Sequence, residues 1–297
     1  MSTRRLHNFI FFCIGILLIG FSGWLVFNFL QPVSHFNGQR AYRDVIVQVS
    51  LGPRTPGSIA HAQTIAYIQQ ELVNAGWKVQ IQTIEWDGFS IQNIIATRSE
   101  ITPSILIGAH YDSRLLADQD PGPGRSEPVP GANDGASGVA VLLELARTLP
   151  SDSLPVWLVF FDAEDNGKLD NRHWIMGSRA FVASLTVKPQ SVVIVDMVGD
   201  ADLNIFIERN SDTNITAEIW AQAAALGYEN YFISTPKYEI LDDHSPFLEA
   251  GIPAVDIIDF DYPYWHTTAD TSDKVSAQSL HVVGETLWVW IESQNNQ

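Results

Sequence analysis

The chain has 297 residues, of which 46% are hydrophobic, so it can bury a substantial core and is not disordered throughout. Its 34 acidic side chains against 17 Lys and Arg give a formal net charge of -17, which argues against nucleic acid as a partner. The single cysteine, Cys13, excludes an intrachain disulfide and a cysteine-based zinc site, so any metal must be held by His, Asp and Glu.

The N-terminal region contains an uncharged apolar run, Phe9 to Leu30, whose 22 residues match the ~20 that a helix needs to cross a bilayer. The run predicts a transmembrane signal-anchor helix within residues 1–36. A buried core helix is one alternative. A cleaved signal peptide is another, although the run is longer than usual for one and no small-residue cleavage pattern follows it. Arg4 and Arg5 precede the run, so we expect a single-pass membrane protein whose domain 37–297 lies outside the cytoplasm.

The rest of the chain alternates helical and β-type patterns. Two helices joined by a loop rich in Gly and Pro are predicted between about Arg40 and Gly76. Strand-like runs begin at Lys78, Ser90, Ser104, Pro155, Ser191 and Pro253, and further helical segments begin at Val139, Thr213 and Lys274. Several of these strands are too apolar to face water. The pattern therefore predicts an α/β domain with three α/β/α layers and a mostly parallel central mixed sheet.

Candidate metal-binding side chains follow the apolar strands, where ligands of such sheets collect. They are His110 and Asp112 after ILIGA, Asp162, Glu164 and Asp165 after VWLVFF, Asp196 at the end of SVVIV, and His266 beyond AVDIIDF. Asp134 lies in the Gly-rich turn GANDGASG, where small residues let the backbone bend and direct a carboxylate inward. Singly, each Asp could be a helix cap and each His a hydrogen-bonded residue. Their recurrence at several strand ends predicts a site for a cation such as zinc.

Seven short motifs occur in an order that resembles the zinc aminopeptidase and glutaminyl cyclase family. They are HYDS from His110, GANDGASG from Gly131, FFDAED from Phe160, GSRAF from Gly177, DMVG from Asp196, DDHSPF from Asp242 and WHTTAD from Trp265. The resemblance covers roughly Leu51 to Ile291, and the order of the motifs makes it specific. It implies a zinc-dependent enzyme that acts on the N-termini of peptides or proteins.

The resemblance also implies a set of metal ligands. Asp134, Asp165 and His266 match the zinc ligands common to both branches of the family. His110 and Asp196 match the positions that hold a second zinc in the aminopeptidases, whereas the cyclases bind one zinc. The family usually has Glu at position 165, so the ligand arm here is one methylene shorter, and a surface helix cap is the alternative role for Asp165.

Three further residues are matched to the chemistry itself. Glu164 matches the catalytic general acid/base. In the cyclases, Asp242 and Asp196 match carboxylates of a hydrogen-bond network beside the substrate. Asp242 also has a structural alternative, since it could simply cap a helix that begins near His244.

Three features favour the cyclase branch. The segment between Glu164 and Gly177, which contains Trp174, resembles a cyclase insert. Trp265 directly precedes His266, as in the cyclases, and could wall a small pocket for a glutamine side chain. The doubled aspartate of DDHSPF is also more cyclase-like, although both tryptophans could be core aromatics.

Other features point to different functions. HTTADTSDKV, together with the presence of both His110 and Asp196, resembles the aminopeptidase branch. The resemblance thus predicts a glutaminyl-peptide cyclotransferase with one zinc ion, and a zinc aminopeptidase with two as the alternative. A metal-free binding module is a third hypothesis. It is disfavoured because every expected position retains a residue able to bind a metal or move a proton.

Overall fold

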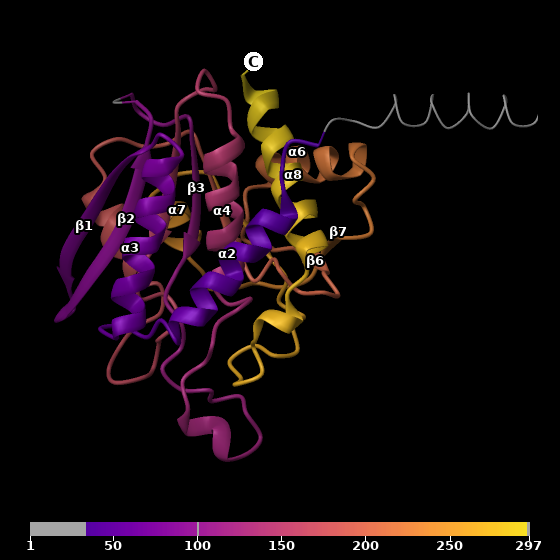
Figure 1. The fold of residues 1–297 in the computed structure, drawn as a ribbon. Helices are drawn as coiled ribbons and strands as arrows, with labels where there is room; N and C mark the ends of the chain where they lie inside the picture. The colour runs from indigo at the N-terminus through magenta and orange to yellow at the C-terminus, as the bar shows by residue number, and fades with distance from the viewer. Residues whose placement is uncertain (1–33, 100, 296–297) are drawn as a thin grey trace, which may run out of the picture. The chain divides into compact units, whose positions relative to one another are not determined.

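A six-stranded sheet forms the centre of the described residues, 34–99 and 101–295, of the computed structural model (Figure 1). Its strands, in spatial order, are β1 (Lys78–Trp86), β2 (Phe89–Thr97), β4 (Val156–Phe161), β3 (Ile105–His110), β5 (Ser191–Asp196) and β8 (Ala254–Ile258). Strands β4, β3, β5 and β8 pair in parallel, and β2 is antiparallel to both of its neighbours. The predicted α/β class with a mostly parallel mixed sheet is confirmed.

The parallel strands are buried on both faces. Successive side chains of a strand point to opposite faces, and in β5 Val193 belongs to the larger hydrophobic cluster whereas Ile194 belongs to the smaller one. Phe160 and Phe161 of β4 are divided in the same way. Because both faces need apolar side chains, these strands have nearly continuous apolar sequences.

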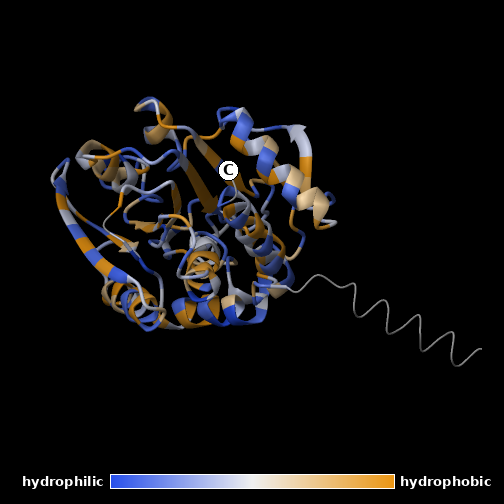
Figure 2. Ribbon diagram, turned by 90° about the horizontal axis from the view of Figure 1, so that it is seen from above, coloured by the Kyte–Doolittle hydropathy of each residue, from blue (hydrophilic) through white to orange (hydrophobic). Residues whose placement is uncertain are grey.

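Helices supply the other side of each cluster. The larger cluster contains residues of α2 (Gly38–Leu51), α3 (Ile59–Asn74), α4 (Ala136–Thr148), α6 (Thr213–Ala225) and α8 (Ala277–Gln294), and the smaller one contains residues of α5 (Met176–Ser184) and α7 (Ser245–Glu249). Figure 2 shows central strands that are mostly hydrophobic, whereas the surrounding helices alternate between hydrophobic and hydrophilic residues. Two short 3-10 helices lie at Pro123–Ser126 and Ser272–Lys274.

The sequence patterns missed three short elements. Strands β6 (Ile205–Ile207) and β7 (Phe232–Pro236) form a separate parallel pair. They are three and five residues long and mostly exposed or half-buried, so their sequences show no regular alternation of apolar and polar residues. Helix α5 begins without a capping side chain, which removes the usual signal of a helix start.

The predicted transmembrane helix, Phe9 to Leu30, lies outside the described residues. Within the ranges that the structure describes, no helix is both long enough and apolar enough to cross a membrane. Residues from Phe36 onward cluster as one unit.

The first turn of α4 approaches the sheet closely. A Cβ atom on Gly138 would lie 2.1 Å from the backbone oxygen of Val195 in β5, so only glycine permits this contact. We expect Gly138→Ala to lower the free energy of unfolding by about 1–3 kcal/mol, measured by urea denaturation. Gly122→Ala is the matched control, because no described atom lies within 4 Å of a Cβ there and φ is -138°. Equal stabilities of the two variants would contradict the close approach.

Candidate metal centre

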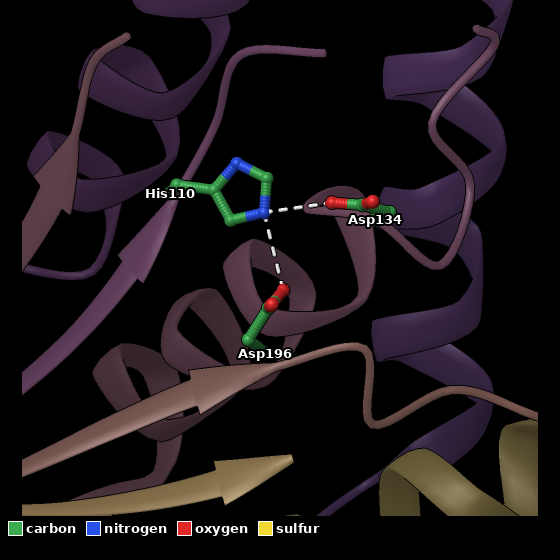
Figure 3. Close-up of side chains that lie close together, drawn as sticks. All are labelled: His110, Asp134 and Asp196. Atoms are coloured by element: carbon green, nitrogen blue, oxygen red, sulfur yellow. Dashed lines mark hydrogen bonds and ion pairs between the residues drawn. The ribbon is translucent and has the colours of Figure 1, made fainter. Parts of the chain in front are cut away.

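Five side chains from distant parts of the chain meet at the carboxyl ends of the parallel strands. His110 ends β3, Asp196 ends β5, Asp165 follows β4, His266 follows β8, and Asp134 lies in the turn before α4. The Nε2 atom of His110 lies 3.0 Å from Oδ1 of Asp134 and 3.1 Å from Oδ1 of Asp196 (Figure 3). The Nε2 atom of His266 lies 2.8 Å from Oδ1 of Asp165 and 3.9 Å from Oδ2 of Asp134.

These residues form two clusters that share Asp134. One is His110, Asp134 and Asp196, and the other is Asp134, Asp165 and His266, and in each the potential ligand atoms lie within 4.8 Å of one another. Among the described residues, the buried Oδ2 atoms of Asp134 and Asp165 have no hydrogen-bond partner. Burial removes the hydration of these atoms and nothing compensates for the loss. A cation bound between them would provide that compensation. Imidazole nitrogens with carboxylate oxygens are also a donor set that zinc accepts, so the residues fit a divalent metal.

The turn that carries Asp134 is held from two sides. Arg54 is fully buried and donates hydrogen bonds to three backbone carbonyls, including that of Gly131. On the other side, Asp270 accepts the backbone N–H groups of Asn133 and Asp134 at 2.8 and 3.2 Å. Gly131 has φ +70° and a Cβ there would lie 2.5 Å from Arg54, so this position of the motif requires glycine. Sequence analysis gave no role to Arg54 or Asp270.

Each histidine has a carboxylate at its other ring nitrogen. Oδ1 of Asp112 lies 3.4 Å from Nδ1 of His110, and Oδ1 of Asp118 lies 3.3 Å from Nδ1 of His266. A carboxylate in this place favours a proton on Nδ1 and leaves Nε2 free to bind a metal. Sequence analysis missed Asp118, whose only local signal is its pairing with Arg114 four positions before it.

We expect Asp118→Ala to weaken metal binding by about 10- to 100-fold, the range for partners that orient a metal ligand. The affinity can be measured by isothermal titration with zinc. Asp120→Ala is the control, since Asp120 lies on the same loop but accepts hydrogen bonds from Thr268. An Asp118→Ala variant with the affinity of the control would show that His266 needs no orienting carboxylate.

Glu164 lies beside the clusters with an unusual protonation equilibrium. Burial raises its pKa well above the usual value, and the neighbouring charges of Asp242 and Asp165 add to this, whereas His110 opposes it. Its backbone N–H donates to Asp112 at 3.1 Å, which fixes the start of the loop. A carboxylate with a raised pKa is a stronger base than an ordinary one, and once protonated it can return the proton during a reaction.

The clusters open into a pocket of about 440 Å³ with aromatic walls. Its lining includes Asp134, Glu164, Asp165, Asp196 and Asp242 together with Trp174, Phe260, Trp265 and His266. The ring of Trp174 stacks on His266 with centroids 5.9 Å apart, and Trp265 stacks on the same imidazole at 3.7 Å. The segment after the acidic pair thus brings Trp174 back to the site.

Most of the candidate site residues line this pocket: Asp134, Glu164, Asp165, Trp174, Asp196, Asp242, Trp265 and His266. His110 contacts two of them, and Asp112 lies behind His110 outside the lining. Two interpretations change. Asp162 also follows β4, but its carboxylate bonds to His61 at 2.8 Å and to the backbone N–H of Gln92, outside both clusters. Asp165 is buried and precedes no helix directly, so its alternative role as a surface helix cap is wrong.

Residues 93–291 match the family described as Peptidase family M28. The chain belongs to peptidase family M28. The resemblance to zinc aminopeptidases and glutaminyl cyclases is confirmed. The M28 chain is 25% identical to the glutaminyl-peptide cyclotransferase of Boiga irregularis, over 89% of this chain and 83% of the relative.

Solved structures agree with this assignment. The M28 chain resembles Porphyromonas gingivalis glutaminyl cyclase with a TM-score of 0.83 and 34% identity, covering 88% of this chain and 100% of the other. It also resembles a Zn-dependent exopeptidase from Parabacteroides distasonis with a TM-score of 0.82 and 32% identity, covering 88% and 99%. Its structural neighbours therefore include both a glutaminyl cyclase and a Zn-dependent exopeptidase.

Proposed function

We propose that this M28 chain is a glutaminyl-peptide cyclotransferase, which converts the N-terminal glutamine of a peptide or protein to pyroglutamate and releases ammonia. The small aromatic pocket carries the proposal. Trp174 and Trp265 line the space beside Glu164 and the two clusters of candidate metal ligands, and the volume of about 440 Å³ lies in the range of small-ligand sites. The similarity to cyclotransferases over most of the chain supports the same function.

Asp134, Asp165 and His266 would hold a zinc ion. When bound there, zinc would act as a Lewis acid that polarises the γ-carbonyl of the glutamine side chain. The orphaned oxygens of Asp134 and Asp165 support this ligand set. His110 and Asp196 would complete a second site if two ions bind.

Glu164 would move the proton of the reaction. It lies in the pocket, where it can take a proton from the attacking α-amine and deliver it to the departing ammonia. Asp242 lines the same pocket, and its charge helps to raise the pKa of Glu164, which makes Glu164 a stronger base for this proton. Trp174 and Trp265 would pack against the substrate and exclude water, so the amine and not a water molecule would attack.

The second candidate function is that of a zinc aminopeptidase. The observation that favours it is the complete cluster of His110, Asp134 and Asp196, which shares a carboxylate with the first cluster as two-metal hydrolases do. Glu164 would then remove a proton from water instead of from an amine.

The direct test is to incubate the zinc-loaded protein with a glutamine-initiated peptide and its leucine-initiated counterpart and to determine the product masses. Loss of ammonia from the first peptide alone is the expected result. Release of a free amino acid would overturn cyclisation in favour of aminopeptidase action. Unchanged masses for both peptides would overturn both functions.

We also propose that residues 1–36 anchor the enzyme domain, residues 37–297, in a membrane, with this domain outside the cytoplasm. The uncharged run from Phe9 to Leu30 and the arginines that precede it support the proposal. The full chain should resist alkaline extraction from membranes, and its domain should be digested by protease added outside intact cells. Release by alkaline extraction would contradict the anchor.

A further inference from the structure

A second group of buried ionisable side chains lies beyond the pocket. Asp242, His244 and Asp256 bring potential ligand atoms within 4.8 Å of one another, and all three are buried. Among the described residues, the following atoms have no hydrogen-bond partner: both ring nitrogens of His244, both carboxylate oxygens of Asp243 and of Asp256, and Oδ2 of Asp242. Burying a polar atom without a hydrogen bond lowers the stability of the fold, so a cluster of several such atoms needs an explanation.

His244 lies between two carboxylates that approach opposite sides of its ring. Its Nδ1 atom lies 3.7 Å from Oδ2 of Asp256, and its Nε2 atom lies 3.4 Å from Oε2 of Glu208. An imidazole can accept a proton at one nitrogen and release one from the other. Both distances exceed a hydrogen bond by a few tenths of an ångström or more, so a small rotation of the ring or one water molecule would connect each pair.

Asp242, Asp256, His244 and Glu208 form a row of buried side chains whose two ends, Asp242 and Glu208, reach different cavities. Asp242 lines the aromatic pocket of the candidate metal centre. Glu208 lines a second cavity of about 550 Å³ between α6 and the β6–β7 pair. Exposed residues such as Ala217 and Ser234 border this second cavity, so it communicates with solvent. The row therefore joins a site that a bound substrate would close to a cavity that stays open to water.

Glu208 is suited to the solvent end of the row. Its carboxylate accepts the backbone N–H groups of Asn210, Ser211 and Ile240. Burial opposes ionisation, but the nearby imidazole of His244 and the hydrogen bonds from the backbone outweigh it and lower the pKa of Glu208 to about 2. A carboxyl with so low a pKa passes a proton to water readily and does not store it.

We propose that Asp256, His244 and Glu208 form a proton path from the candidate metal centre to the second cavity. The inference rests on the proposed cyclase function. A peptide N-terminus arrives largely as an ammonium group and must lose one proton before its nitrogen can attack. That proton would pass to Asp242, then through Asp256, His244 and Glu208 to water in the second cavity.

The remaining protons balance within the pocket. As the nitrogen–carbon bond of the ring forms, Glu164 takes a second proton from the attacking nitrogen. It gives this proton to the amide nitrogen as the carbon–nitrogen bond of the side chain breaks. One ammonium peptide thus yields one pyroglutamyl peptide, one ammonia molecule and the one proton that leaves by the path.

The test compares the full-length wild type with His244→Gln and Glu208→Gln at constant pH and ionic strength while the concentration of 2,6-lutidine is raised, a hindered base that carries protons but is a poor zinc ligand. We expect both variants to lose about tenfold or more in kcat for a glutamine-initiated peptide, with KM nearly unchanged. The lutidine should restore part of that loss by carrying protons through the second cavity. The wild type should show no such dependence on the buffer.

His61→Gln is the matched control. His61 is also buried and bonded to a carboxylate, that of Asp162, but it lines neither of the two cavities described. It should lose stability without acquiring a buffer dependence, which separates proton transfer from a merely structural effect.

Three outcomes would overturn the path. If His244→Gln and Glu208→Gln keep the kcat of the wild type, or lose it without rescue by lutidine, His244 carries no proton for the reaction. If His244→Gln binds one metal ion fewer than the wild type, the cluster is a cation site. A wild type that cyclises no peptide would overturn the proposed function together with the path, whereas the first two outcomes overturn the path alone.

Discussion

Glu164→Gln is expected to lower kcat for cyclisation of a glutamine-initiated peptide by about 10²–10⁴-fold, the usual contribution of a positioned acid/base. Gln keeps the shape of the side chain but can neither accept the amine proton nor deliver it to ammonia. The variant should retain its metal, because Glu164 belongs to neither cluster. Steady-state kinetics combined with metal analysis by mass spectrometry would measure both properties.

Glu127→Gln is the control for this experiment, since it makes the same chemical change on an exposed side chain. It should leave kcat nearly unchanged. A near-normal rate for Glu164→Gln would show that another group moves the proton. Loss of metal together with activity would instead assign Glu164 a role in metal binding.

Asp134→Asn is expected to weaken metal binding by more than about 100-fold, beyond the range for residues that only orient a ligand. The reason is that Asp134 belongs to both clusters, so one substitution removes a negative ligand from each. Activity should fall with metal content, and added zinc should restore only part of it. Isothermal titration and activity at increasing zinc concentration would measure this.

Asp162→Asn provides the comparison. Asp162 is buried at the same edge of the sheet, but it binds His61 and lies outside both clusters. It should lower the stability of the fold while metal content stays normal. If both variants bind zinc equally well, Asp134 is not a ligand.

Metal affinity is expected to fall as the pH is lowered. Burial raises the pKa of Asp196 to about 7, with Asp242 adding to the effect, and raises that of Asp165 to about 6, with Asp134 adding. A carboxyl with a raised pKa is protonated below that pH, and metal binding requires the deprotonated form. Zinc affinity should therefore decrease steadily as the pH falls from about 8 to about 5. An affinity that does not change between these conditions would contradict the assignment.

Sequence could predict the side chains that gather at the strand ends because the topology itself brings them together. Once β3, β4, β5 and β8 are parallel, residues such as His110 and Asp196 must lie at one edge of the sheet. The same argument wrongly included Asp162, because a position directly after a strand does not show in which direction its side chain points. Asp162 contacts α3 and β2 instead of the clusters.

The supporting residues could not be predicted in this way. Arg54 acts on backbone carbonyls, and Asp118 acts on the far nitrogen of His266, so neither belongs to a pattern of ligand types. Their positions depend on how two loops fold against each other. The path through His244 and Glu208 likewise depends on a packing between α7, β8 and the end of β6 that no periodicity expresses.

The shared carboxylate of Asp134 also bears on how a preparation of this protein should be handled. A first cation at either cluster neutralises part of the charge that a second one would use, so the second step is weaker and the two affinities are linked. If both clusters bind zinc as proposed, the number of ions found after purification would depend on the free zinc of the growth medium and of each buffer. Separate preparations of the protein would then differ in metal content, so the dialysis steps of each preparation need to be specified.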